Sequence, residues 1–455
     1  MLIILVLVPL VFGRTEDILY QFNWLNFTFD DPADAESYVN NQLYTCCMPA
    51  GIKMNSQGDI FISVPRWKEN VVATLNQIVS QNDDALLLKP FPSLEENEEG
   101  VAEALQSVLG FEIDLDDYIW VLDQGKVNGN SAIAKSQKLV KYNSITGKKN
   151  MTYDLSSVTS ANNSFLNDIV LDPLREFAYI TDSGLPINSD DPLEPAIIVL
   201  NTKTSQVWRL LASDISVMNN ETLRIYINGE QVLKNSPMET GADGIALSCD
   251  KRTLYYTPLT SQYLYSIDTM YLRDPKYHAN ISNYVQPIGW KKSASDGLAA
   301  SEKNNLYITA LEYNSVYKQP DITNVASDFS VNKFTIYGND SERMMWPDTL
   351  GFNNKDKTLL VVANQLHHFE DGTINFNKPT VGDHNFYIWS IDVNDRSYLY
   401  GCEDISADND TYEAFPTWAK ILVCILGVII LIIIGCVIKN IIKARKRKRQ
   451  ALINN

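Results

Sequence analysis

The sequence predicts an all-β fold: a six-bladed β-propeller ectodomain followed by a single transmembrane helix. Two observations carry this prediction. A unit of two short apolar strands recurs six times along the chain, and one long apolar run near the C-terminus precedes a basic segment. A chain of 455 residues is too long for one ordinary compact core. A closed ring of repeated blades can hold such a length in a single domain.

Each repeated unit contains a short apolar strand, a polar turn and a second strand rich in Leu, Tyr, Ile and Val. The clearest copy is NDIVLDPLREFAYITDSG, in which an Asp precedes the first strand. The six units begin at Gly51, Phe111, Asn167, Ala242, Ser295 and Pro347. One interval is longer than the others, and we interpret its polar segment, residues 216–240, as an insertion between two blades.

A third alternating run follows the paired strands, as in KLVKYNSITGK, AIIVLNTKTSQVWRLL, QYLYSIDTMYL, SVYKQ and FYIWSID. Four strands in each unit, separated by polar turns, are typical of propeller blades. The stretch ILYQFNWLNFTF, residues 18–29, is expected to add a strand to the last blade and to close the ring. A helix-rich fold is disfavoured, because period-two alternation dominates the chain before the C-terminal apolar run.

Residues 1–13 (MLIILVLVPLVFG) predict a cleaved secretory signal peptide rather than an uncleaved anchor. Its length and the small residues before the expected cleavage site favour this prediction, although the segment lacks Lys and Arg. The predicted ectodomain therefore comprises residues 14–410.

The second apolar segment, residues 418–438, predicts the transmembrane helix. Its uninterrupted part, residues 421–438, would span about 27 Å as a helix. The tail, residues 439–455, contains seven Lys and Arg and no acidic residue, which places it in the cytoplasm. We predict a single-pass type I protein of the cell membrane, with its ectodomain outside the cell.

The whole chain has a net charge of −17 although its tail is basic, so the ectodomain is strongly acidic. Such a domain does not bind nucleic acid or an anionic lipid surface through charge. It attracts cations, including organic amines. The alternative is that the charge only maintains solubility.

The sequence contains six cysteines, of which Cys424 and Cys436 lie in the predicted membrane segment. The four lumenal cysteines, Cys46, Cys47, Cys249 and Cys402, are disulfide candidates in an oxidising compartment. Since a bond between adjacent cysteines is strained, we expect Cys46 and Cys47 to bond separately to Cys249 and Cys402, in either order. Candidate glycosylation sites are Asn26, Asn150, Asn162, Asn220, Asn280, Asn339 and Asn409.

The recurrent acids predict a candidate site. Asp168, Asp243, Asp296 and Asp348 occupy the same place in four units and are expected to ring one mouth of the central channel. Such a ring can bind a ligand amine or a metal, but repeated Asp residues also commonly hold neighbouring backbone groups. Among the aromatic residues near strand ends, Tyr307 and Phe386 are candidates for a ligand-binding wall.

We predict no cofactor, and a structural Ca²⁺ in the channel stays an open alternative. No hydrolase or phosphate-loop motif occurs in the sequence. His367 and His368 follow a strand; they are candidates for acid–base chemistry or for a pocket lining, but a surface turn is favoured.

The segment SVPRWKENVVATLN, residues 63–76, joins two strands of the first unit. Pro65 is expected to interrupt the strand ladder, and Val71 to Leu75 to restart it. Arg66 and Trp67 are expected to pack or pair where the first and last blades meet. We interpret this segment as architectural rather than catalytic.

A series of motifs extends from about residue 40 to 392 and includes GDIFISVPRWKENVVATLN, LLLKPFPSLEEN, IWVLDQG, DGIALSCDKRTLYYTPLTSQYLYSI, WPDTLGF and NFYIWSI. In its motifs and their order, this series resembles the yellow / major royal jelly protein family of arthropods. The resemblance implies a six-bladed propeller, in agreement with the repeat count. It also implies a range of roles: pigmentation or cuticle formation, conversion of dopachrome, binding of biogenic amines, and nutrition.

Two departures from the family pattern concern cysteines and the C-terminus. Asp116-Asp117-Tyr118 stands where the family often has Cys-Gly-Arg, and the cysteine expected ahead of Lys138 is missing, so one family disulfide is absent. Cys249 is an addition relative to that pattern. The C-terminal apolar segment departs from the soluble members and disfavours a diffusible role.

Three functions remain in competition. We favour a membrane-anchored binding module whose channel mouth holds a small aromatic amine or catechol-type ligand, in a pigmentation, cuticle or amine-related context. The alternative is an isomerase that acts on dopachrome, in which a channel carboxylate or His moves a proton between carbon and oxygen. The third is a structural or adhesive surface protein. The sequence identifies no catalytic residue, no metal ligand and no protein partner.

Overall fold

The computed structural model describes residues 16–402 except residues 83, 189, 323–328 and 380. The predicted signal peptide, transmembrane segment and tail lie outside the described residues. Among the described residues, no helix is both long enough and apolar enough to cross a membrane.

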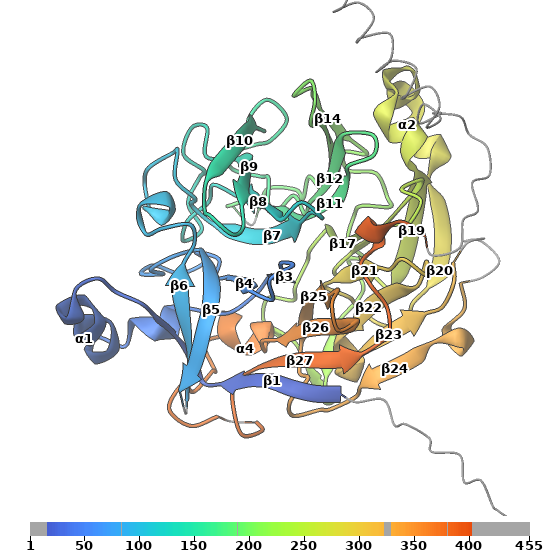
Figure 1. The fold of residues 1–455 in the computed structure, drawn as a ribbon. Helices are drawn as coiled ribbons and strands as arrows, with labels where there is room; N and C mark the ends of the chain where they lie inside the picture. The colour runs from blue at the N-terminus through green and yellow to red at the C-terminus, as the bar shows by residue number, and fades with distance from the viewer. Residues whose placement is uncertain (1–15, 83, 189, 323–328, 380, 403–455) are drawn as a thin grey trace, which may run out of the picture. The chain divides into compact units, whose positions relative to one another are not determined.

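Six sheets of four or five strands form the blades of a propeller within the described part of the chain (Figure 1). The first blade contains β3 (Ile52–Met54), β4 (Ile60–Ser63), β5 (Leu75–Asn82) and β6 (Ala85–Pro90). The second contains β7 (Val108–Ile113), β8 (Tyr118–Asp123), β9 (Lys138–Asn143) and β10 (Lys149–Asp154). The third contains β11 (Leu166–Asp172), β12 (Phe177–Asp182), β13 (Ala196–Asn201) and β14 (Val207–Leu210). The fourth blade contains β17 (Ala242–Leu247), β18 (Thr253–Pro258), β19 (Tyr263–Asp268) and β20 (Gln286–Trp290). The fifth contains β21 (Leu298–Ala300), β22 (Leu306–Ala310), β23 (Ser315–Gln319) and β24 (Thr335–Gly338). The sixth contains β25 (Pro347–Asn353), β26 (Thr358–Ala363) and β27 (Phe386–Asp392). The predicted six-bladed propeller is confirmed.

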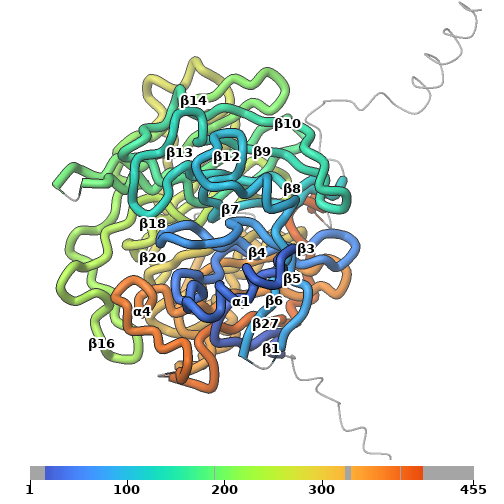
Figure 2. The backbone as a smooth tube through the Cα atoms, turned by 90° about the vertical axis from the view of Figure 1, so that its left-hand side faces the viewer, coloured from blue at the N-terminus to red at the C-terminus, as the bar shows by residue number. Residues whose placement is uncertain are grey.

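The N-terminal segment closes the ring, as the sequence predicted. Strand β1 (Glu16–Phe22) pairs antiparallel with β27 and becomes the outer strand of the sixth blade. Figures 1 and 2 both show β1 beside β27. The next strand, β2 (Trp24–Phe27), pairs in parallel with β6 of the first blade. One short segment therefore joins the first blade to the last.

The innermost strands of neighbouring blades contact one another all the way round the ring: β3, β7, β11, β17, β21 and β25. Glycines permit this close approach. A Cβ atom on Gly244 would lie 2.7 Å from the carbonyl oxygen of Asp296, and one on Gly297 would lie 2.5 Å from that of Asp348. The Asp-Gly pairs of the repeat therefore place an acid beside a point where two inner strands nearly touch.

In the described part of the chain, the helices lie in the connections between strands or, for the last one, after the final strand. They are α1 (Pro32–Asn40), η1 (Leu43–Cys46), η2 (Glu95–Asn97), α2 (Thr269–Arg273), η3 (Pro275–Tyr284), η4 (Leu311–Tyr313), η5 (Val331–Lys333), α4 (Leu366–Glu370) and η6 (Tyr398–Tyr400), where η denotes a 3-10 helix. Asp31 caps α1 by accepting the backbone N–H of Ala33.

The predicted insertion between the third and fourth blades is confirmed. It contains the hairpin β15 (Tyr226–Ile227) and β16 (Glu230–Gln231), whose turn is Asn228-Gly229. The Asn228 side chain donates to the Ser341 carbonyl and accepts from Asn314, at 2.9 and 2.8 Å. Figure 2 shows β16 near α4. The insertion thus extends to the fifth and sixth blades.

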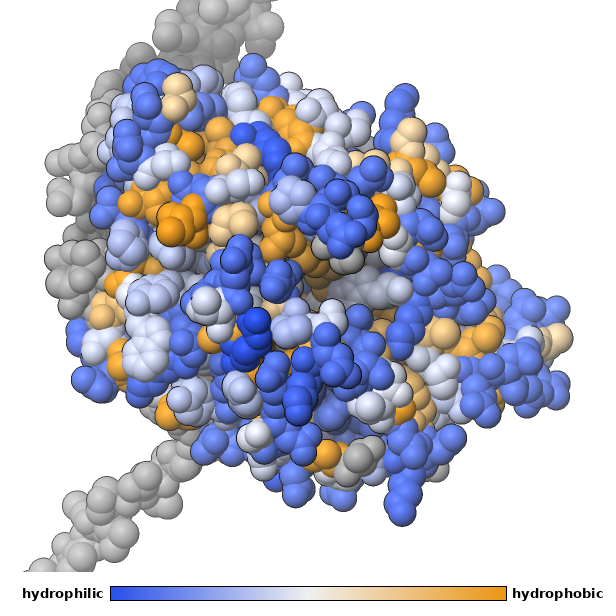
Figure 3. Space-filling view, turned by 180° about the vertical axis from the view of Figure 1, so that it is seen from behind, coloured by the Kyte–Doolittle hydropathy of each residue, from blue (hydrophilic) through white to orange (hydrophobic). Residues whose placement is uncertain are grey.

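Apolar side chains fill the space between neighbouring blades. The largest buried cluster combines strands of the second to fifth blades, and a second cluster combines the first and sixth blades with the insertion. On the face shown in Figure 3, hydrophobic residues form separate patches among hydrophilic ones. The packed layers between blades therefore replace a single central core.

Candidate ligand-binding site

β-Bulges at the start of two inner strands place two of the acidic side chains of the site, Asp243 and Asp348. The pairing register shifts between Ala242 and Ile245 in β17, and between Pro347 and Leu350 in β25. Each shift leaves two residues outside the regular ladder, the first of which is Asp243 or Asp348. Bulges of this kind redirect a side chain at the rim of a sheet.

The sequence alignment of Asp168 with the other acids is wrong by one residue. Leu166 pairs with Asp182 in the way that Ala242 pairs with Pro258, so Asn167, and not Asp168, is equivalent to Asp243. The amide of Asn167 donates to Oδ2 of Asp243 at 2.7 Å. Asp168 is displaced along the channel and borders both cavities described below.

A cavity of about 480 Å³, here called the mouth cavity, lies at this end of the channel. All four predicted acids line it. Trp67 and Phe165 form an aromatic part of the wall, with ring centroids 6.4 Å apart. The apolar part of the lining includes Leu185, Ile187, Leu233, Met238, Leu259 and Leu366, of which Leu233 and Met238 belong to the insertion. The cavity combines an apolar wall with a carboxyl floor.

Three buried carboxyl groups form the floor, and their hydrogen-bond partners are neutral or are one another. Asp243 and Asp296 are hydrogen-bonded to each other, and the Trp346 indole N–H donates to Asp296 at 2.6 Å. The amide of Asn364 donates to Asp348 at 2.5 Å. The exposed fractions of Asp243, Asp296 and Asp348 are 2%, 9% and 6%. The three carboxyl groups of the floor are therefore grouped together and largely shielded from solvent.

Burial raises the pKa of Asp243, Asp296 and Asp348 well above the usual range of a carboxyl group. Repulsion between the acids raises each pKa further. The hydrogen bond between Asp243 and Asp296 is consistent with one proton shared by the two carboxyl groups. A cation placed between the carboxyl groups would stabilise their ionised forms, which burial and mutual repulsion disfavour.

Two lysines at the rim of the mouth cavity donate hydrogen bonds to backbone carbonyls of the surrounding loops. Lys126 donates to the carbonyls of Asn162 and Leu185 at 2.6 and 3.0 Å. Lys68 donates to the Phe369 carbonyl at 2.9 Å. Burial lowers the pKa of Lys126 to about 8. These ammonium groups therefore support the walls rather than neutralise the floor.

Arg66 is an architectural clamp, but it acts at a different junction from the predicted one. Its guanidinium donates to the carbonyls of Leu105 and Gln106 at 2.9 and 2.6 Å, in the loop that leads into β7. The clamp therefore joins the first blade to the second, and not to the last. The strand after Pro65 restarts at Leu75 rather than Val71.

Trp67 belongs to the cavity wall, although its sequence context favoured packing. Its indole nitrogen is buried and has no hydrogen-bond partner among the described residues. A donor of this kind can serve a hydroxyl or carbonyl oxygen of a ligand. The sequence gives no signal that separates this residue from a packing tryptophan.

The structure places His367 beneath the floor instead of on the favoured surface turn. His367 is 7% exposed, lies in α4 and stacks on Trp346 with ring centroids 5.4 Å apart. Burial and the neighbouring His368 lower the pKa of His367 to about 3, so its ring is neutral. His367 thus supports the indole that binds Asp296.

Tyr307 and Phe386 lie away from the mouth cavity. The Tyr307 hydroxyl donates to Asp395 at 3.1 Å, and the ring packs on Phe352. Phe386 packs on Phe22, with centroids 5.6 Å apart, inside the cluster of the first and sixth blades. Both are buried between blades, so the expected aromatic wall is formed by other residues.

The opposite end of the channel is covered by residues 394–402, here called the closing segment. Tyr398, which is 4% exposed, accepts the Leu171 backbone N–H on its hydroxyl at 2.7 Å. Asp395 accepts from Asn305 at 2.6 Å. Beneath Tyr398 is a cavity of only about 30 Å³, bordered also by Lys53, Glu112 and Asp168. It is the size of about one water molecule.

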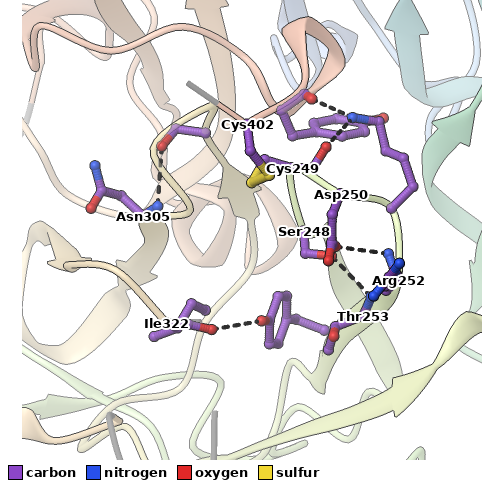
Figure 4. The surroundings of a disulfide bond; sticks show 12 residues. Ser248, Cys249, Asp250, Arg252, Thr253, Asn305, Ile322 and Cys402 are labelled. Carbon is purple, nitrogen blue, oxygen red and sulfur yellow. Dashed lines mark hydrogen bonds between the residues drawn. A yellow bond between two sulfur atoms is a disulfide. The ribbon is translucent and has the colours of Figure 1, made fainter. Parts of the chain in front are cut away.

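A disulfide between Cys249 and Cys402 fastens the closing segment to the fourth blade (Figure 4). Lys251 donates to the carbonyls of Cys249 and Tyr398, at 2.7 and 2.5 Å. The predicted pairing is therefore wrong: Cys46 and Cys47 are free. Cys47 is packed against Tyr38 in the apolar cluster of the first blade, which keeps it apart from the bonded pair.

Among the described residues there is no group of three or more His, Cys, Asp or Glu side chains arranged to hold a metal ion. Five candidate glycosylation sites are exposed, namely Asn150, Asn162, Asn220, Asn280 and Asn339, and Asn26 is half-buried in β2. Asn409 lies outside the described residues. Glycosylation itself stays a prediction.

Comparisons with known proteins identify the family of this chain. The chain matches the family model described as "Major royal jelly protein" over residues 106–399. It is 23% identical over 417 residues to "Major royal jelly protein 9" of Apis mellifera, covering 85% of this chain and 90% of that protein. It is 27% identical over 273 residues to "Protein yellow" of Drosophila erecta, covering 56% and 48% of the two chains.

Solved structures similar to this chain include a regucalcin from Agrobacterium tumefaciens, with a TM-score of 0.45 and 12% identity over 78% of this chain and 96% of that one. A luciferin-regenerating enzyme has a TM-score of 0.47 and 11% identity over 85% of this chain and 97% of that one. The family match spans more than half of the sequence, and the resemblance noted from the motifs is confirmed: the chain belongs to the major royal jelly protein family.

Proposed function

We propose that this protein binds a small aromatic amine in the mouth cavity, with the ammonium group on Asp243 and Asp296 and the ring against Trp67 and Phe165. The observation that carries the proposal is the pair of buried, hydrogen-bonded carboxyls on the floor of an otherwise apolar cavity. An ammonium ion supplies the positive charge that these acids lack. An aromatic ring matches the apolar wall.

Calorimetric titration of the protein with dopamine, serotonin and octopamine tests this function. We expect heat of binding at micromolar concentrations of at least one amine. Catechol, which has the ring of dopamine but no ammonium group, is the matched control and should bind more weakly. If no amine produces heat at high micromolar concentrations, the proposal is contradicted.

A second candidate function is the isomerisation of dopachrome. The same carboxyl pair favours it, because two adjacent buried carboxyl groups with raised pKa values can take up and release a proton, as general acid–base chemistry requires. Dopachrome decays spontaneously, so the assay compares its decay with and without the protein. An unchanged decay rate would rule out this activity.

We also propose that the propeller lies outside the cell, anchored by the apolar segment at residues 418–438. The exposed glycosylation motifs and the disulfide support an oxidising compartment. Antibody labelling of intact cells tests the location, and carbonate extraction tests the anchor. Release of the protein into the soluble fraction would contradict anchoring.

A further inference from the structure

The hydrogen bond between Asp243 and Asp296 requires a proton. Two ionised carboxylates are acceptors only, so they cannot bond to each other. Asn167 and Trp346 donate to Oδ2 of Asp243 and of Asp296, and these two bonds fix the orientation of both carboxyl groups. The empty pair therefore holds at least one proton between its two carboxyl groups.

Charged groups of both signs surround the pair, and the acids among them help to retain this proton. They come from several elements: Asp168 in β11, Asp348 in β25, Lys291 after β20, and Arg66, Lys68, Lys126 and Glu370 at the rim. Lys291 donates to the carbonyls of Ser261 and Ser293 at 2.6 and 2.7 Å. Burial lowers the pKa of Lys291 to about 7, which weakens it as a neutralising charge. The two neighbouring acids oppose loss of the proton.

We propose that the mouth cavity exchanges this proton for its ligand: the amine enters as an ammonium ion, takes the place of the proton between Asp243 and Asp296, and the proton leaves to solvent. The inference rests on the proposed function and specifies how its site is regulated. No bond in the ligand changes, and the charge balances, because one cation enters as one leaves. Affinity then rises with pH until the empty pair has lost its proton.

Calorimetry of the full-length protein with dopamine, near neutral pH in phosphate and in Tris, measures this exchange directly. The two buffers absorb a released proton with very different heats. We expect the apparent binding enthalpies to differ by an amount that corresponds to roughly one proton per ligand. The dissociation constant should fall by up to about tenfold per pH unit. Equal enthalpies in the two buffers overturn the exchange but leave amine binding intact, and no heat with any amine overturns both.

Asp296→Asn tests the role of the shared proton. The amide can accept from Trp346 and donate to Asp243, so it reproduces the empty pair without a titrating proton. We expect the buffer dependence to disappear, with residual dopamine binding through Asp243. Asp348→Asn is the comparison variant: it leaves the pair intact, so the buffer dependence should persist, but its onset should move to lower pH because one of the acids that oppose loss of the proton is removed. Thermal unfolding of both variants verifies folding, and a buffer dependence that survives in Asp296→Asn overturns the inference.

Discussion

The two ends of the central channel differ in what occupies them. At the mouth, Asp243, Asp296 and Asp348 line a cavity of about 480 Å³. At the opposite end, the closing segment inserts Tyr398 and leaves about 30 Å³. The acids of the mouth have neutral partners, whereas the closing segment is fixed by a disulfide and by the Arg396–Glu302 ion pair. The carboxyl groups of the mouth therefore remain available to a cationic ligand, whereas the contacts at the closed end stabilise the fold.

This difference shows that one propeller can place ligand binding at one end of its channel and stabilising contacts at the other. Buried acids with raised pKa values cost folding free energy, so their retention needs a compensating role. The closing segment makes the channel a pocket with one entrance. Ligand chemistry is therefore expected only at the mouth, and changes at the closed end should affect folding.

The largest effect is expected from Asp243→Asn combined with Asp296→Asn. Removing both charges should weaken dopamine binding by about 2–5 kcal/mol, or roughly 30-fold or more. The free energy of unfolding should not fall, because two buried carboxyls are removed. Titration calorimetry and urea unfolding measure the two quantities.

The matched control is Asp123→Asn, a fully buried acid whose carboxylate pairs with Lys138 at 2.8 Å. We expect this variant to lose stability and to keep its dopamine affinity. Loss of stability in the Asp243 and Asp296 double variant, with unchanged binding, would show that these acids are structural.

Replacement of both Cys249 and Cys402 by Ser should act at the closed end alone. The bond closes a loop with a sequence separation of 153, and its loss should lower the free energy of unfolding by about 2–5 kcal/mol. Dopamine affinity should stay within about twofold of the original. Denaturant unfolding in the absence of reductant measures the first effect, and a large loss of affinity would refute the separation of the two ends.

Shortening the aromatic wall should have a smaller effect on binding. Trp67→Ala and Phe165→Ala are each expected to weaken dopamine binding by about 1–2 kcal/mol, because ring contacts and cation–π attraction are lost. Phe352→Ala, at the closed end, is the control and should lower stability without changing affinity. If all three variants bind dopamine equally well, the ligand ring does not lie on this wall.

The smallest effect concerns the pH dependence of stability at the closed end. Burial raises the pKa of Glu112 from 4.5 to about 7, so the folded protein binds this proton more tightly than the unfolded chain. Its contribution to stability is therefore lost as pH rises from about 4.5 to 7. Glu112→Gln should raise the free energy of unfolding by on the order of 1 kcal/mol above this range.

Near pH 4 Glu112 is protonated in both states, and the same substitution should have little effect. Urea unfolding on either side of the titration range measures the difference. An equal stabilisation at both pH values would indicate a packing effect rather than a titrating carboxyl.

Much of the fold could be predicted because strand alternation and turn residues are local signals. The six units, the insertion at residues 216–240 and the closing strand at the N-terminus all follow from them. The position of Asp168 was assigned wrongly because the units were aligned on their acids; alignment on the apolar residues Ile169 and Ile245 matches Asp168 with Gly244. The disulfide partners depend on distances between blades, which no local pattern contains.

The candidate site was predicted in part for a related physical reason. Three acids recur just before or at the start of an inner strand, so Asp243, Asp296 and Asp348 were recognisable as a set, and all three line the mouth cavity. Trp67 and Tyr307 both lie near strand ends, yet one faces a cavity and the other a packed layer. Only the blade geometry separates these two environments, because an aromatic side chain suits either.

A structure of the protein with dopamine bound tests the central claim most directly. The account predicts the ammonium nitrogen within hydrogen-bonding distance of both Asp243 and Asp296, with their mutual bond replaced, and the ring against Trp67 and Phe165. Dopamine bound elsewhere, or held in the mouth with its ammonium group toward solvent and the carboxyl pair still joined, would contradict it.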